Sequence, residues 1–88
     1  MEINLKELDH LTRNLTPVSD MALLLGVSEV RLRPLLNDLG TPEGQVYRRA
    51  RAETALRIRK RSIELADAGS PTAAAAVEGY LQAMLMDE

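Results

Sequence analysis

The chain has 88 residues and a formal net charge of −2, which indicates one domain with a marginally stable core and favours an oligomer. Because it has no cysteine and a single histidine, His10, it excludes disulfides and thiolate metal sites and nearly excludes a conventional zinc site. A membrane span and a secretory signal are also excluded, because no apolar run approaches the roughly 20 residues required and acids stand near the N-terminus.

The composition favours an all-α protein of the cytoplasm. Leu and Ala dominate the apolar residues, and Phe and Trp are absent, which suits close helix packing and not strands. We expect five helices in a single domain over residues 1–88. Residues 1–40 form a helix-turn-helix-like part and residues 41–88 a helical hairpin. No cofactor or metal is expected.

The first two predicted helices lie before Gly26. In residues 2–15 apolar side chains recur at mostly three- and four-residue intervals, which is the pattern of one helix face. Thr16-Pro17 then marks a break, and a second helix runs from about Pro17 to Leu25. The stripe of the first helix consists of Ile3, Leu5, Leu8, Leu11 and Leu15.

A third helix is expected to follow Gly26, which can adopt positive φ. Ser28 is a suitable N-cap and Glu29 supplies an acid in the first turn. The helix runs until Gly40 stops it. Its apolar residues are Val30, Leu32, Leu35, Leu36 and Leu39.

Two further helices are predicted after Gly40. Thr41, Pro42 and Glu43 resemble a cap and first turn, and the fourth helix continues to about Ala68. Gly69-Ser70-Pro71 forms the next junction, and the fifth helix runs from about Pro71 to Met86. Because this connection is very short, we expect the last two helices to lie antiparallel.

Residues 21–35 have the apolar spacing of a helix-turn-helix. Ala22 can pack beneath the second helix and Gly26 can make the turn, while Val27, Leu32 and Leu35 lock the two helices together. Arg and Asn are the side chains best suited to bidentate contacts with guanine and adenine edges. In this interpretation the exposed, DNA-facing residues of the second helix are Ser28, Glu29, Arg31, Arg33 and Asn37.

Pro34 leaves two arrangements of that helix open. A proline inside a helix removes one backbone hydrogen bond and crowds the preceding turn. The helix is therefore either kinked, or its first part ends near Arg33 and a new helix starts at Pro34. An alternative to DNA recognition is that residues 17–39 are a compact three-helix core with a solvated edge of arginines.

The fourth helix carries a run of cations in the sequence YRRARAETALRIRKR, residues 47–61. We expect its apolar residues to form a broad buried face, with Tyr47, Ala50, Thr54, Ile58 and Leu65 on one side and Ala52, Leu56, Ile63 and Ala66 beside them. The cations then project from the remaining arc and contact phosphates. They are Arg48, Arg51 and Arg59 near one edge, with Arg49, Arg57, Lys60 and Arg61 spread around it.

The alternative for this helix is a solvated face whose charges are partly paired with acids. Glu53, Glu64 and the acidic N-terminal segment are the available partners. Seven cations with one acid in fifteen residues repel one another, however, and an anionic partner relieves that repulsion. We therefore favour phosphate contact.

The order of these parts resembles that of phage terminase small subunits and related phage-derived proteins. The resemblance covers roughly Val18 to Leu85 and includes ALLLGVSEVRL, TPEGQVYRRARAE and IELADAGSPTAAAAVEGYL. It implies a DNA-binding, non-enzymatic, oligomeric adaptor that hands DNA to a large ATPase and nuclease subunit.

The sequence thus predicts a non-catalytic protein that binds duplex DNA as a homo-oligomer. Neither a glycine-rich phosphate loop nor a nucleophile with a base is present. The alternatives are a helical protein-protein interaction module and a small dimeric transcriptional regulator. The predicted oligomerisation residues are Tyr80, Leu81, Met84 and Leu85.

Overall fold

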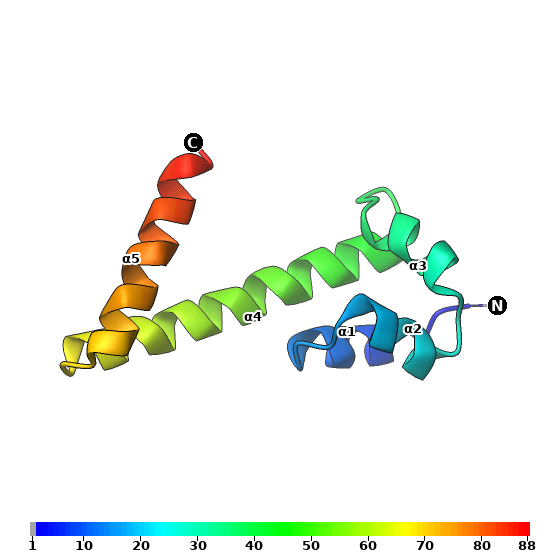
Figure 1. Cartoon of the computed structure of the whole chain (residues 1–88). Helices are drawn as coiled ribbons and strands as arrows, with labels where there is room; N and C mark the ends of the chain where they lie inside the picture. Colours follow the sequence, from blue (N-terminus) through cyan, green and yellow to red (C-terminus); the bar gives the residue numbers. More distant parts are fainter. Residues whose placement is uncertain (1) are drawn as a thin grey trace. The chain divides into compact units, whose positions relative to one another are not determined.

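The computed structural model describes residues 2–88, and the chain is all-helical over that range (Figure 1). The five helices are α1 (Leu5–Arg13), α2 (Val18–Leu25), α3 (Glu29–Leu36), α4 (Pro42–Asp67) and α5 (Pro71–Met86). The expected all-α class with five helices is confirmed. The chain divides into two compact units, which we call the N-terminal unit (to Thr54) and the C-terminal unit (Ala55–Glu88). The division lies within α4, so this helix supplies its first half to one unit and its second half to the other.

Helix α1 is shorter than the predicted span of residues 2–15. It begins after Asn4, whose side-chain oxygen accepts a hydrogen bond from the Glu7 N–H at 3.1 Å. It ends because Leu15 adopts a left-handed φ of 61°, and the Thr16 N–H donates to the Leu11 carbonyl across that turn. Leu15 therefore leaves the predicted apolar stripe and is exposed.

The connection between α2 and α3 is made as the sequence predicted. Gly26 has a left-handed φ of 72°, and the Val27 N–H donates to the Ala22 carbonyl at 3.0 Å. Ser28 stands at the N-cap of α3 with extended backbone, but its side chain makes no capping hydrogen bond.

Helix α3 runs through Pro34 without interruption, so a restart at Pro34 is wrong. The proline leaves the Val30 carbonyl without its helical donor, and water can replace that donor because Val30 is on the surface. The helix ends at Leu36, with Asn37 as C-cap, and not near Gly40. Leu39 therefore lies outside the helix and is exposed.

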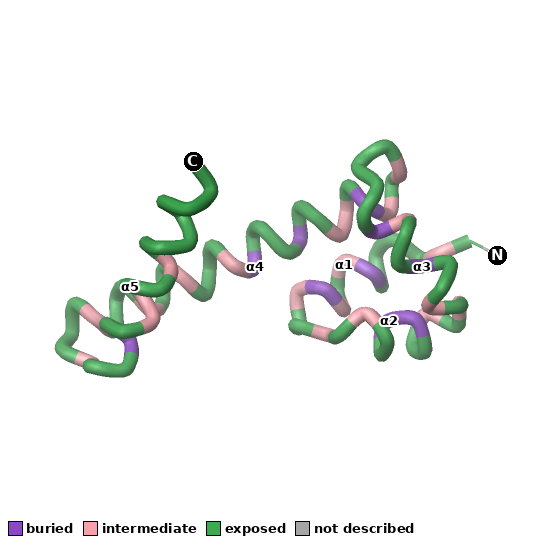
Figure 2. The backbone as a smooth tube through the Cα atoms, turned by 45° about the horizontal axis from the view of Figure 1, so that its top comes forward, coloured by how far each residue is buried: buried purple, intermediate pink, exposed green. Residues whose placement is uncertain are grey.

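The N-terminal unit has a hydrophobic core where α1, α2 and α3 meet, and the first part of α4 packs against it (Figure 2). Three large side chains, Leu8, Met21 and Leu32, are almost completely buried. The remaining buried core residues are Ala22 and Leu36, and the partly buried ones are Ile3, Leu11, Val18, Leu25, Val27, Val46 and Tyr47. The core thus contains most of the residues that were predicted to lock α2 and α3 together.

The start of α4 is held tightly against the end of α3. The Thr41 hydroxyl accepts from the Gly44 N–H at 2.9 Å and donates to the Leu35 carbonyl at 2.8 Å. Gly44 is buried, and a Cβ at that position would collide with the Asp38 carbonyl and lie 2.9 Å from the Leu35 carbonyl oxygen. The predicted cap at Thr41 is confirmed.

The C-terminal unit comprises the second half of α4, a short turn and α5. Gly69 adopts a φ of 100°, and the Ser70 side chain accepts from the Ala73 N–H at 3.2 Å, as expected of a helix stop followed by a cap. Figure 1 shows α5 diverging from α4 beyond the turn. The full antiparallel packing of these helices stays a prediction.

The broad buried face predicted along all of α4 is wrong for the exposed Ala52 and for the second half of the helix. Ala50 and Thr54 are buried, but no residue of α4 after Thr54 is. The burial ends there because only the N-terminal unit offers a core for the helix to pack on. The large apolar side chains that remain exposed in the C-terminal unit are Leu56, Ile58, Ile63, Leu65, Leu81, Met84, Leu85 and Met86.

Candidate nucleic-acid interface

The predicted DNA-facing residues of α3 lie away from its buried side. Leu32 and Leu36, four residues apart, define the side of α3 that enters the core. All residues of the predicted DNA-facing set are exposed except Glu29, which is half-buried. The set consists of Ser28, Glu29, Arg31, Arg33 and Asn37. The surface needed for groove contact is therefore available.

Two of these side chains are already paired with each other. The Arg33 Nε donates to the Glu29 carboxylate at 2.9 Å, one helical turn away. Within residues 2–88, Arg31 has no carboxylate partner within 4.0 Å. Arg31 is consequently the arginine of α3 whose hydrogen-bonding groups remain open to a ligand.

Val30, one of the apolar residues of the predicted third helix, does not enter the core. It is 82% exposed and lies on the side of α3 opposite Leu32 and Leu36, on one line with Pro34. The four-residue spacing of Leu32 and Leu36 in the sequence could have indicated that Val30 and Pro34 lie on the opposite, exposed side of the helix. An apolar side chain among exposed polar ones can contact the methyl group of thymine in the major groove.

The cations in the first half of α4 have different surroundings. Arg51 lies over the ring of half-buried Tyr47, with its guanidinium carbon 5.3 Å from the ring centroid. Arg49 is 3.6 Å from Glu53, and Arg48 is exposed and has no ion pair in the described chain. Only Arg48 of these three is exposed without an aromatic or acidic partner.

An ion-pair network joins α1 to α4 beside these residues. The Arg13 guanidinium contacts Glu53 at 2.7 Å and Asp9 at 3.0 Å. The hydrogen bond from Arg13 holds the pKa of Glu53 below its ordinary value, and hydrogen bonds to Asp9 and Glu53 raise the pKa of Arg13. Glu53 thus pairs mainly with Arg13 of α1 and secondarily with Arg49, whereas the alternative interpretation expected it to pair with the cations of α4.

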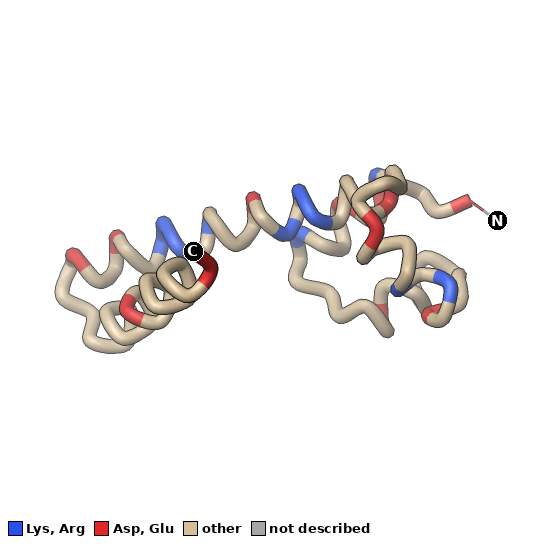
Figure 3. The backbone as a smooth tube through the Cα atoms, turned by 90° about the horizontal axis from the view of Figure 1, so that it is seen from above, with Lys and Arg blue, Asp and Glu red and all other residues tan. Residues whose placement is uncertain are grey.

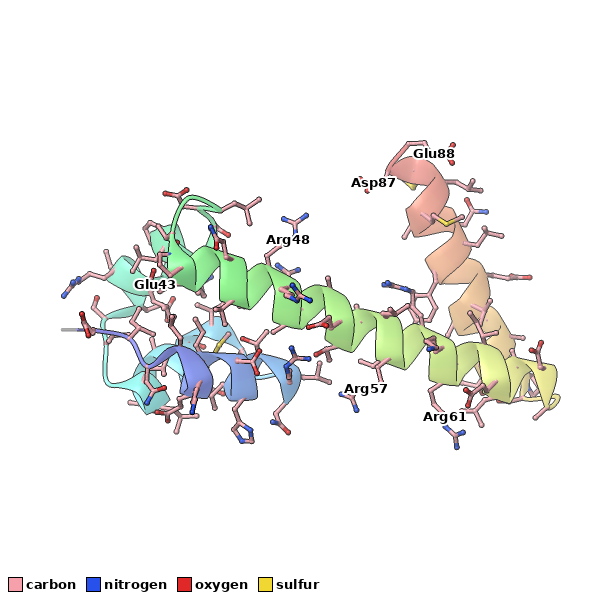
Figure 4. The ribbon with its side chains drawn as sticks, turned by 180° about the vertical axis from the view of Figure 1, so that it is seen from behind. Glu43, Arg48, Arg57, Arg61, Asp87 and Glu88 are labelled. Carbon is pink, nitrogen blue, oxygen red and sulfur yellow. The ribbon has the colours of Figure 1, made fainter. Side chains whose placement is uncertain are left out.

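The cations in the second half of α4 point to two sides. Arg57, Lys60 and Arg61 are three and four residues apart and share one side, and Figure 4 shows Arg57 and Arg61 projecting together. Arg61 contacts Glu64 at 3.3 Å, whereas Arg57 and Lys60 have no ion pair among residues 2–88. Arg59 is half-buried on another side, with Ser62 and Ala66.

The structure therefore does not gather the seven cations on a single face. Figure 3 shows Lys and Arg on both halves of α4. Within each half their spacing along the helix places them on more than one side. On α3 and α4, the exposed cations of residues 2–88 that have neither an ion pair nor an aromatic contact nevertheless occur in each unit: Arg31, Arg48, Arg57 and Lys60.

No family model, curated protein or solved structure matches this chain. The resemblance to terminase small subunits accordingly stays a prediction. In residues 2–88 no three His, Cys, Asp or Glu side chains are grouped so that they could hold a metal ion. None of the helices in that range has the length and apolar character needed to cross a membrane.

Proposed function

We propose that the protein is a non-catalytic DNA-binding adaptor of the cytoplasm that contacts duplex DNA through α3 and through cations of α4. In this proposal α2 and α3 act as a helix-turn-helix, and each unit supplies its own contacts. The protein works as a homo-oligomer and, by its resemblance to terminase small subunits, cooperates with a large terminase-like subunit.

The observation that carries the proposal is a set of exposed cations on α3 and α4 that have neither an ion pair nor an aromatic contact. A chain with net charge −2 and 13 acids has enough carboxylates to pair every cation, yet on these two helices Arg31, Arg48, Arg57 and Lys60 have none within 4.0 Å in the described residues. Such side chains bind phosphates at little desolvation cost and release condensed counterions from DNA. The position of Arg31 on the outer side of α3 additionally suits contact with a guanine edge.

Retention on duplex DNA at increasing salt tests the proposal. Binding by the wild-type protein should weaken steeply with salt, and each lost phosphate contact should reduce the slope of log K against log salt by about 0.9. We expect this reduction in the single variants Arg48→Ala, Arg57→Ala and Lys60→Ala. Arg31→Ala should also reduce discrimination between DNA sequences.

Lys6→Ala is the matched control, because it removes one exposed cation from α1 instead of from the proposed surface. It should leave both the affinity and the slope unchanged. Wild-type retention that does not depend on salt, or equal slopes for the wild type and the three α4 variants, would contradict the proposal.

A further inference from the structure

One side of α5 is buried near the turn and becomes exposed toward the far end of the helix. Ala73, Val77, Tyr80 and Met84 follow one another at three- and four-residue intervals and so share one side of the helix. Ala73 is 8% exposed, Val77 and Tyr80 are half-buried, and Met84 is 59% exposed. The loss of cover matches the divergence of α5 from α4 (Figure 1).

Two leucines extend this exposed surface. Leu81 and Leu85 lie next to Met84 on the last two turns of α5, and each is 48% exposed. Together these half-exposed side chains form an apolar surface at the end of α5. An apolar surface of this kind at the end of a helix is typical of a contact with another helix.

Arg59 lies on a partly covered side of α4. Ser62 and Ala66, three and seven residues later, are half-buried as Arg59 is and share that side of the helix, and α5 is the other helix of this unit. Partial burial of a cation is costly unless an anion is near. In the described chain, however, no carboxylate lies within 4.0 Å of Arg59.

The complementary charge lies at the far end of α5. Residues 62–88 contain no Lys or Arg, and the acids Asp87 and Glu88 directly follow α5. Figure 4 shows these two acids beyond the last turn of α5, away from α4. The C-terminal unit therefore carries a half-buried cation and exposed acids that form no ion pair with one another in the described chain.

We propose that a second copy of this chain covers the apolar surface at the end of α5. In the pair, Leu81, Met84 and Leu85 of one copy pack on the same residues of the other, and Asp87 and Glu88 of each α5 approach Arg59 of the other copy. A two-fold symmetric dimer satisfies this arrangement, because both copies then use the same surface and each contact between them occurs twice. The partner is thus identified by the self-complementarity of the surface.

This inference rests on the proposed homo-oligomer and is independent of DNA binding, and it changes the role of one cation. Arg59 was predicted to contact DNA, but here it belongs to the contact between copies. Lys60, its neighbour in the chain, projects from another side of α4 and stays in the proposed DNA surface. The two adjacent cations therefore have different functions.

Molar mass by light scattering, without DNA, tests the pairing. The wild-type protein should have the mass of two copies at micromolar concentration. The double variant Leu81→Glu/Leu85→Glu should be monomeric, with an unchanged helical signal by circular dichroism because both side chains are exposed. Leu24→Glu, at a leucine of the N-terminal unit that is 57% exposed, should remain dimeric.

Charge exchange tests the position of Arg59. Arg59→Glu should raise the dimer dissociation constant by at least about tenfold, because it places three acids together. Combining it with Asp87→Arg and Glu88→Arg should restore the dimer. Lys60→Glu should leave the dimer intact and weaken DNA retention.

Three results would overturn the inference: a monomeric or higher-order wild type, a dimeric Leu81→Glu/Leu85→Glu variant, or no restoration by charge exchange. A dimer that does not bind DNA would contradict only the proposed function.

Discussion

The two units use the same apolar residue types with opposite results. In the N-terminal unit three short helices and the start of α4 converge, so that Leu8, Met21 and Leu32 lose almost all contact with water. In the C-terminal unit only two helical segments are present, and Ala73 is its one buried apolar residue within the described chain. Leucines on a helix become a core only when other elements surround them, and otherwise they remain available to a partner.

Truncating one leucine in each unit tests this comparison, and we expect it to change the free energy of unfolding more than any other substitution below. Leu32→Ala removes a completely buried side chain and should lower the free energy of unfolding by about 2–5 kcal/mol. Leu56→Ala, at a half-exposed position of the C-terminal unit, should change it by no more than about 0.5 kcal/mol. Urea unfolding followed by circular dichroism measures both. Equal losses would show that Leu56 is part of a core.

Adding a methyl group to one glycine in each unit should give effects of opposite sign. Gly44→Ala places a Cβ against the carbonyl groups of Asp38 and Leu35, and we expect a loss of about 1–3 kcal/mol. A Cβ at Gly79, within α5, meets no atom, so Gly79→Ala should stabilise the helix by about 0.5–1 kcal/mol. Thermal unfolding of the two variants is the measurement, and a stabilising Gly44→Ala would contradict the tight contact between α3 and α4.

Thr54 is the last buried residue before the division between the units, so substituting it tests where the buried part of α4 ends. Its hydroxyl is buried without a hydrogen-bond partner, so Thr54→Val should raise the free energy of unfolding by about 1 kcal/mol. Thr12 is the control, since it is equally buried but its hydroxyl donates to the Leu8 carbonyl at 2.7 Å. Thr12→Val should therefore be destabilising in the same unfolding experiment.

The smallest expected effect concerns the ion pairs at the surface of the two units. Arg13 lowers the pKa of Glu53 below 4.5, so the stability that this carboxylate contributes is present above pH 4.5 and is lost as the pH falls through its lowered pKa.

Glu53→Gln should consequently lower the melting temperature slightly at pH 7 and leave it unchanged near pH 2. Glu64→Gln, which breaks one 3.3 Å contact in the C-terminal unit, should lower it less at pH 7. A Glu53→Gln effect that is equal at both pH values would exclude the charged pair as its cause.

The positions at which helices start and stop were largely predictable from the sequence. Gly26 and Gly69 adopt positive φ, and Thr41 and Ser70 accept backbone hydrogen bonds, because turns and caps depend on a few neighbouring residues. The end of α1 escaped prediction, since a leucine at position 15 adopts the left-handed conformation in which glycine is usual. The run of cations in residues 47–61 was also evident from the sequence, but the side chains with which these cations form ion pairs were not.

What the sequence determined by itself is the helical class, the turns and the amount of charge and apolar surface, because these depend on residue type and local spacing. Only the tertiary structure decided that Arg13 engages Glu53 and that Arg59 is half-buried without an ion pair in the described chain. Burial and ion pairing depend on which elements approach each side of a helix, and residues far apart in the chain determine that approach.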